Sequence, residues 1–324
     1  MSGDRIRITC PPSNISKELR IKQLFKNIEM WCRSEALLNL FSEFNVTTDQ
    51  NLDLKSYIAY IYTHASRLWD FRKKTSSGQR WDVSDSGEIE SKADFIFATA
   101  RKLGLTDITE PVFRPDFVLP LGGARMTNLL RPQMARFVID EYDWYDVTVV
   151  ALSAYRPKME IDEPYYSEYA PDALTEYDAI CRGMEKAFDL KRDYEEEISG
   201  GDMLYARSTI RHYTSGYKGC DIYAMAAPSP EPEKRWANSR DNYEFFLEHF
   251  NIKPGDKILL TTSCIYVPAQ HLRFMDIAIE KGFEVDCIGV TPEIQGSSFN
   301  KPSNYLQEIK STIDAIYDLS CRYL

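Results

Sequence analysis

The stretch Phe117–Glu141, FVLPLGGARMTNLLRPQMARFVIDE, decides the fold of this 324-residue chain. It opens with a short apolar run, which is typical of a buried strand. Gly122 and Gly123 follow and allow a tight turn. Apolar residues at helical spacing then predict a helix over 129–141. A strand, a glycine turn and a helix form the first half of a βαβ unit.

The same alternation repeats toward the C-terminus. Further apolar runs lie at 147–152, 222–226, 257–261 and 284–290. The helices predicted after them cover 173–188, 239–250, 267–281 and 305–323. Strands that alternate with helices predict a parallel sheet, and right-handed crossovers place helices on both of its faces. We therefore expect an α/β fold, a Rossmann-like parallel sheet of about five strands flanked by helices.

The first third of the chain reads as helical. Its predicted helices cover 16–44, 54–71 and 89–103. Gly104 supplies a C-cap signal for the last of them, and the polar stretch 73–87 predicts an exposed loop. We expect residues 1–112 to form a helical N-terminal extension packed on the core, and residues 113–324 to form the α/β domain.

Composition narrows the class of protein. The net charge is −10 and no basic block occurs, which argues against nucleic acid as a partner. The seven cysteines are dispersed without a CxxC pair, and the chain has only four histidines, so we expect no metal. Reduced thiols and the lack of an apolar leader or of a membrane-spanning run predict a cytoplasmic protein without a membrane span. Composition leaves the oligomeric state open.

Ligands of parallel sheets bind beyond the carboxyl ends of the strands, so the loops there are the candidate site. In the first loop, Gly122 and Gly123 let a ligand approach the backbone, and the following helix start suits an anion. Arg125 and Arg131 could hold a phosphate or carboxylate. A plain tight turn explains the two glycines almost as well.

Ser153 and Arg156 follow the second strand and are expected to face the same cleft. Ser153 has no base beside it in sequence, so we expect its hydroxyl to bind ligand rather than to act as a nucleophile. Glu176 opens the next helix, where a carboxylate either stabilises the helix start or binds a ligand.

The densest polar cluster opens the helix after the third strand. Asn238 or Ser239 could cap this helix, and a cap needs only one of them. Asp241 and Asn242 then remain in the first turn, where side chains can reach a cleft. A solvated helix start is the alternative.

Thr262, Ser263 and Tyr266 follow the fourth strand and complete the predicted ligand site. Cys264 lies near a helix start, which can lower a thiol pKa, but an inert buried cysteine is the better interpretation. The central prediction is that Gly122, Ser153, Asp241 and Ser263 surround one shared hollow.

In this order, the motifs resemble the SanA/YdcF/ElyC-type domain family over residues 115–290. The matching segments are 119–131, 151–154, 175–176, 238–242 and 260–263. Two departures stand out. The His and Arg of the family pattern fall on Tyr266 and Ala269, and its second glycine turn is Ala154-Tyr155 here.

The resemblance implies a Rossmann-like fold and an S-adenosylmethionine-like or phosphate-bearing small-molecule ligand, with S-adenosylmethionine as the cofactor. A transferase of small-molecule metabolism would fit it, because group transfer needs positioning more than a strong nucleophile. The alternative is a non-catalytic ligand sensor or a protein-interaction module that uses the aromatic residues of the N-terminal helices.

Overall fold

The structure is a computed structural model that describes residues 5–74, 85–295 and 300–324. The chain forms two compact units. Unit 1 comprises Met1–Ile108, Cys264–Gly282 and Thr291–Leu324, and unit 2 comprises Thr109–Ser263 and Phe283–Val290. Two helices that we assigned to the α/β domain thus group with the N-terminal helices. Whether residues 1–112 form an extension that folds on the remainder stays a prediction.

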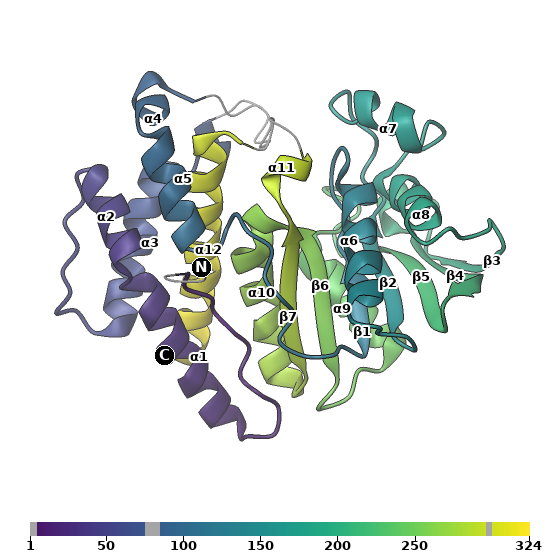
Figure 1. Ribbon diagram of the computed structural model, residues 1–324, viewed down its shortest axis with the longest axis horizontal. Helices are drawn as coiled ribbons and strands as arrows, with labels where there is room; N and C mark the ends of the chain where they lie inside the picture. The colour runs from purple at the N-terminus through teal and green to yellow at the C-terminus, as the bar shows by residue number, and fades with distance from the viewer. Residues whose placement is uncertain (1–4, 75–84, 296–299) are drawn as a thin grey trace. The chain divides into compact units, whose positions relative to one another are not determined.

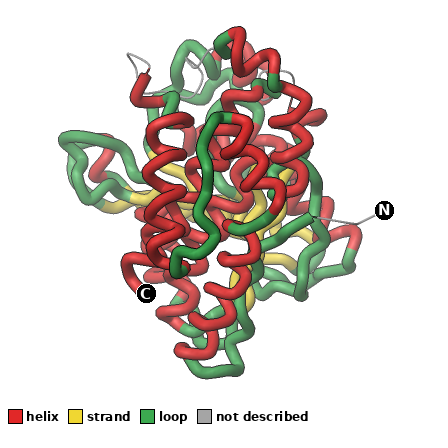
Figure 2. Tube along the Cα trace, turned by 90° about the vertical axis from the view of Figure 1, so that its left-hand side faces the viewer, coloured by secondary structure: helices red, strands yellow, loops and turns green. Residues whose placement is uncertain are grey.

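In the described part of unit 1, every regular element is a helix, and Figure 2 draws the helices in red. Its α-helices are α1 (Lys17–Cys32), α2 (Glu35–Glu43), α3 (Leu54–Trp69), α4 (Gly87–Ser91), α5 (Ala93–Lys102), α10 (Val267–Lys281), α11 (Pro292–Gln295) and α12 (Pro302–Tyr323). Short 3-10 turns occupy Arg72–Lys74 and Cys264–Tyr266. The long helix α12 is the centre of this unit, since it packs against α3, α5 and α10.

Two predicted helices of unit 1 are each broken in two. The predicted helix 16–44 divides into α1 and α2, because the Ser34 side chain accepts from the backbone N–H of Leu37 and starts a new helix. The predicted helix 89–103 divides at Lys92. Most of the predicted loop 73–87 lies outside the described residues.

Unit 2 is built on a seven-stranded mixed sheet of order β3-β4-β5-β2-β1-β6-β7 (Figure 1). The strands are β1 (Phe117–Pro120), β2 (Thr148–Ala154), β3 (Tyr194–Ser199), β4 (Ser208–Tyr217), β5 (Cys220–Ala227), β6 (Lys257–Ser263) and β7 (Glu284–Val290). The five strands from β5 to β7 in this order pair in parallel. The pairs β3–β4 and β4–β5 are antiparallel.

The prediction of a purely parallel sheet of five strands is therefore wrong, although the α/β class is confirmed. The strand β3 reads YEEEIS, and all six of its residues are exposed. It offers neither an apolar run nor an alternating pattern, which are the two signals that identify a strand in a sequence. The antiparallel pair β3–β4 was missed for this reason.

The helices of unit 2 cover both faces of its sheet. They are α6 (Thr127–Glu141), α7 (Glu163–Tyr169), α8 (Glu176–Ala187) and α9 (Ser239–Phe250). In Figure 1, α6 and α8 lie in front of the sheet and α9 lies behind it. On the front face, Val149 and Ala151 of β2 pack with residues of α6 and α8, whereas Ala154 packs on the other face against Ala237, just before α9. Successive residues of a strand point to opposite faces, which explains this division.

The strand order reverses at β1. The chain runs from β1 outward through β2 to β5, and then crosses back to place β6 on the other side of β1. In open α/β sheets, ligands bind outside the carboxyl ends of the strands at such a reversal. The residues that follow β1 and β6 are therefore the first candidates for a ligand site.

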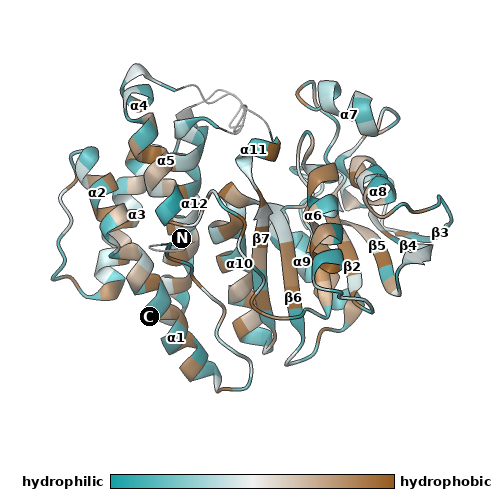
Figure 3. Ribbon diagram, in the orientation of Figure 1, coloured by the Kyte–Doolittle hydropathy of each residue, from teal (hydrophilic) through white to brown (hydrophobic). Residues whose placement is uncertain are grey.

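The hydropathy of the strands agrees with their positions inside the sheet. In Figure 3, β6 and β7 are apolar along most of their length, as expected for strands buried on both faces. Within the ranges that the structure describes, no helix combines the length and the apolar character needed to cross a membrane.

Candidate functional site

The loop after β1 brings three of the predicted site residues together. A Cβ atom added to Gly122 would lie 2.4 Å from Oε1 of Glu176 and 3.0 Å from Cβ of Ser153. The N–H of Gly122 donates to the carbonyl of Leu152 at 2.6 Å. Gly122 is therefore required by the close approach of β2 and of the Glu176 carboxylate.

Gly123 is fixed by the first turn of α6. Its N–H donates to Oδ1 of Asn128 at 2.9 Å, and Nδ2 of Asn128 donates back to the Gly123 carbonyl at 2.7 Å. The same Nδ2 donates to the hydroxyl of Tyr166 at 3.0 Å. The amides of Gly122 and Gly123 thus both donate within the protein. This arrangement favours the plain-turn explanation of the two glycines.

Arg131 joins the ends of the two strands that flank the reversal. Its Nη1 donates to the carbonyls of Leu121 and Gly122 at 2.7 and 2.6 Å, and its Nη2 donates to Oγ of Ser263 at 3.1 Å. The Oγ1 of Thr261 in turn donates to the carbonyl of Arg131. Arg131 is buried, so it positions the loop after β1 against the end of β6.

Arg156 is the centre of a buried charge network. Its Nε donates to Oε2 of Glu176 at 2.9 Å, and its Nη1 donates to Oδ2 of Asp162 at 3.0 Å. Burial by itself would lower the pKa of Arg156, but the two carboxylates outweigh this and raise it. The sequence reasoning did not select Asp162. Its position in the acidic stretch 159–171, beside Arg156 along the chain, is the signal that could have found it.

The backbone and the side chain of Arg125 contact different residues. Its backbone lies in the left-handed region at a φ of 59°, and its N–H donates to Oδ1 of Asp162 at 2.8 Å. The hydroxyl of Tyr169 donates to its carbonyl at 3.0 Å. The guanidinium lies 5.9 Å from the ring centre of Tyr165, and the residue is half-buried. Arg125 is thus a partly accessible cation directly before α6.

Oγ1 of Thr262 is buried at the end of β6 and has no hydrogen-bond partner among the described residues. Thr261 and Ser263 both contact Arg131 of α6, so Thr262, which lies between them, points to the opposite face of the sheet. Oε2 of Glu176 accepts from Arg156, and Oε1 lies on the side of Gly122.

The segment before α9 serves mainly to start that helix. Oδ1 of Asn238 accepts from the N–H groups of Arg240 and Asp241, and a carboxylate oxygen of Asp241 accepts from the N–H of Asn238. Nη1 of Arg235 also donates to this carboxylate, at 2.5 Å. Ser239 and Asn242 are half-buried beside them. Two of the predicted ligand residues, Asn238 and Asp241, therefore form the cap of α9.

The four residues predicted to surround one hollow are divided between the two faces of the sheet. Gly122 lies against Ser153, and Arg131 links the Gly122 carbonyl to Ser263. Asp241 belongs to the α9 face, and none of the hydrogen bonds or ion pairs of the described residues joins it to the other three. Tyr266 belongs to unit 1. A ligand role for these residues stays a prediction.

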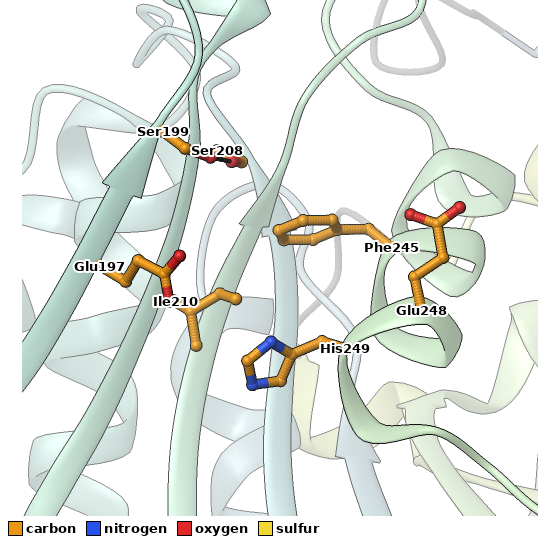
Figure 4. Close-up of a pocket in the computed structure, with 7 residues that line it drawn as sticks. All are labelled: Glu197, Ser199, Ser208, Ile210, Phe245, Glu248 and His249. Carbon is orange, nitrogen blue, oxygen red and sulfur yellow. Dashed lines mark hydrogen bonds between the residues drawn. The ribbon is translucent and has the colours of Figure 1, made fainter.

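A groove lies elsewhere in unit 2, between the antiparallel strands and α9. It has a volume of about 250 Å³ and is lined by Glu197, Ser199, Ser208, Ile210, Phe245, Glu248 and His249 (Figure 4). We call it the β3–α9 groove. The sequence did not predict this groove, because one of its walls is made by β3 and β4, two strands that were not predicted.

In the part of the chain that the structure describes, no group of three or more His, Cys, Asp or Glu side chains could hold a metal ion. Burial raises the pKa of the Cys264 thiol to about 12, the opposite of the shift that activates a nucleophile.

Comparison with known proteins identifies distant relatives. Residues 16–104 match the family model described as the Rv3785 N-terminal domain. Uncharacterized protein Mb3814 of Mycobacterium bovis and uncharacterized protein Rv3785 of Mycobacterium tuberculosis are each 24% identical to this chain over 337 residues. Each alignment covers 95% of this chain and 93% of the relative. No solved structure matches.

These matches overturn the resemblance to the SanA/YdcF/ElyC-type family, which is wrong. The motifs behind it are a glycine turn, small residues after a strand and polar helix starts. Such features recur at the strand ends of many unrelated α/β proteins, because the fold itself calls for them. The helical first third, which the resemblance left unplaced, is the part that the family model matches.

Proposed function

We propose that this protein binds a small phosphate-bearing molecule at the carboxyl edge of a Rossmann-like set of parallel strands, where the strand order reverses between β1 and β6. The observation that carries the proposal is the convergence of buried polar side chains at this edge. Arg131 ties the end of β1 to Ser263, and Arg156 holds Glu176, whose Oε1 lies on the side of Gly122.

The phosphate would bind at the start of α6. The start of a helix carries the positive end of the helix dipole, which favours an anion. Arg125 adds a partly accessible guanidinium directly before this helix. Because the amides of Gly122 and Gly123 donate within the protein, we assign the anion to Arg125 and the helix start instead of to the glycines.

The uncharged part of the ligand would contact Glu176. A carboxylate oxygen accepts from a hydroxyl or an amine. The expectation of S-adenosylmethionine came from the family resemblance that the comparisons contradict, so we do not carry it forward. The transferase reaction and the sensor alternative both stay predictions.

Thermal unfolding with a panel of compounds tests the proposal. The panel contains inorganic phosphate, nucleoside phosphates, sugar phosphates and S-adenosylmethionine. A compound present at about 100 times its dissociation constant stabilises the folded state by about 2.7 kcal/mol. We expect at least one phosphate compound to raise the melting temperature, and neutral parent compounds to leave it unchanged.

Variants locate the binding. Arg125→Gln should reduce the shift caused by the active compound. Arg240→Gln, which removes an exposed arginine paired with Glu244 on α9, is the matched control and should keep the full shift. If every phosphate compound leaves the melting temperature unchanged, or if Arg125→Gln responds like the unmodified protein, the proposal is wrong.

A further inference from the structure

The β3–α9 groove combines an apolar floor with an acidic rim. Ile210 of β4 and Phe245 of α9 supply the apolar surface. Glu197 extends from β3 and Glu248 from α9, so a carboxylate stands on each wall (Figure 4). A long side chain with an apolar stem and a charged end, as in lysine or arginine, matches this combination.

The carboxylates of the groove are not neutralised by the protein. Neighbouring acids are paired: Glu196 with Arg211 and Glu244 with Arg240. Within the described parts of the chain, neither Glu197 nor Glu248 forms an ion pair with a lysine or arginine. Both belong to exposed residues, in a chain whose net charge is −10. The groove therefore favours cations over anions.

Within the described ranges of the chain, the strand β3 forms one edge of the sheet and pairs only with β4. An edge strand leaves alternate N–H and C=O groups pointing outward, which is a template for one more strand. Proteins usually protect such an edge with charge. Glu196 is paired with Arg211, but Glu195 and Glu197 supply protecting charges of one sign. They repel a second copy of β3 but attract a basic strand.

We propose that β3 and the β3–α9 groove bind an extended, basic segment of a partner protein. The segment adds to β3 as a further strand, and one of its lysine or arginine side chains enters the groove between Glu197 and Glu248. Main-chain hydrogen bonds then supply affinity, and the groove supplies the preference for a basic residue. The inference is independent of the phosphate site, since the two regions share no residue.

The test uses the full chain and a fluorescent peptide of about nine residues in which lysine alternates with valine or threonine, a pattern that favours an extended strand. Fluorescence anisotropy should show saturable binding that weakens as salt rises, because salt screens ion pairs. A peptide with glutamate in place of lysine should not bind. A lysine peptide that is N-methylated at alternate residues should bind at least about tenfold more weakly, since it cannot form the ladder.

Variants of the groove complete the test. Glu197→Gln and Glu248→Gln should each weaken binding by about fivefold, as expected for one accessible ion pair, and the double variant should weaken it further. Glu141→Gln, at an exposed position at the end of α6, is the matched control and should bind like the unmodified protein. Circular dichroism checks that each variant is folded.

Three results would overturn the proposal. They are equal binding of the glutamate peptide, unchanged binding of the N-methylated peptide, and an equal loss of binding in Glu141→Gln and in the groove variants. The first and third would mean that the groove does not select the charge. The second would mean that no strand is added to β3.

Discussion

Two regions of unit 2 use charged residues in opposite ways. At the carboxyl edge of the parallel strands, Arg156 is enclosed between Asp162 and Glu176, and all three are buried. In the β3–α9 groove, Glu197 and Glu248 are exposed, and no lysine or arginine of the described residues forms an ion pair with them. The first region contributes its charges to the fold, whereas the second leaves them available.

The buried charges therefore affect the stability of the fold, whereas the exposed charges are available to bind a partner. A buried ion pair is costly to break, because the remaining partner is left without water or a counter-ion. An exposed carboxylate contributes little to folding, so its presence on a groove costs the protein little. Variants in the two regions should therefore differ widely in their effect on unfolding, and we order our predictions by that effect.

Arg156→Met should have the largest effect. It leaves the Asp162 and Glu176 carboxylates buried without their cation, which should lower the free energy of unfolding by about 3–5 kcal/mol. Urea denaturation at neutral pH measures the change. A loss below about 1 kcal/mol would show that the network is hydrated and that the two regions differ less than we infer.

Gly122→Ala should come next. The added methyl group would lie 2.4 Å from Oε1 of Glu176 and 2.9 Å from the Leu152 carbonyl, so the backbone must shift, at a cost of about 1–3 kcal/mol. Gly201→Ala is the control, since nothing lies within 4 Å of its added Cβ. Urea denaturation measures the free energy of unfolding of both variants. Equal values would show that Gly122 has no steric role.

Tyr166→Phe should have a smaller effect that depends on pH. Burial raises the pKa of the Tyr166 hydroxyl, and Asp162 and Glu176 add to the shift. A raised pKa in the folded state means stability that is present below about pH 10, the unfolded value, and is lost as pH rises further. Losing the hydrogen bond from Asn128 should cost about 1 kcal/mol at pH 8.

The loss of stability at high pH tests the role of the Tyr166 hydroxyl. Urea denaturation at pH 8 and near pH 10.5 should show that the phenylalanine variant loses less stability between the two values than the unmodified protein. A parallel loss in both proteins would assign the alkaline sensitivity to other buried tyrosines, such as Tyr169 and Tyr177, whose pKa values burial also raises.

Glu248→Gln should have the smallest effect on folding. The residue is exposed and forms no ion pair with another described residue, so the free energy of unfolding should change by less than about 0.5 kcal/mol. The measurement is again urea denaturation, with Glu141→Gln as the reference. A loss of about 1 kcal/mol or more would mean that the carboxylate has a structural partner and that the groove is not a free surface.

The sequence predicted the regular elements well where their signals are local. The predicted ranges 239–250, 267–281 and 284–290 coincide with α9, α10 and β7. A helix start or end depends on a few neighbouring residues, such as the Asn238 cap of α9 or Gly282 after α10. The break between α1 and α2 was missed, because the apolar spacing continues across the capping residue Ser34.

The candidate site was predicted only in part. The sequence selected Gly122, Ser153 and Glu176, which the structure brings together. It did not select Asp162, although the acidic stretch 159–171 is a local signal for it, because the contact of Asp162 with the backbone of Arg125 joins residues far apart along the chain. It also assigned Asp241 to the same hollow, because periodicity does not tell which face of a sheet a following helix will cover.

By itself, the sequence determined that this chain alternates strands with helices after Pro115 and that the loops at the strand ends are polar, because spacing and caps are properties of neighbouring residues. Only the tertiary structure decided that β6 returns beside β1, that β3 and β4 extend the sheet, and that α9 closes a groove against them. These outcomes depend on pairing between segments far apart along the chain, where hydrogen bonds and burial select among arrangements that local patterns leave equivalent.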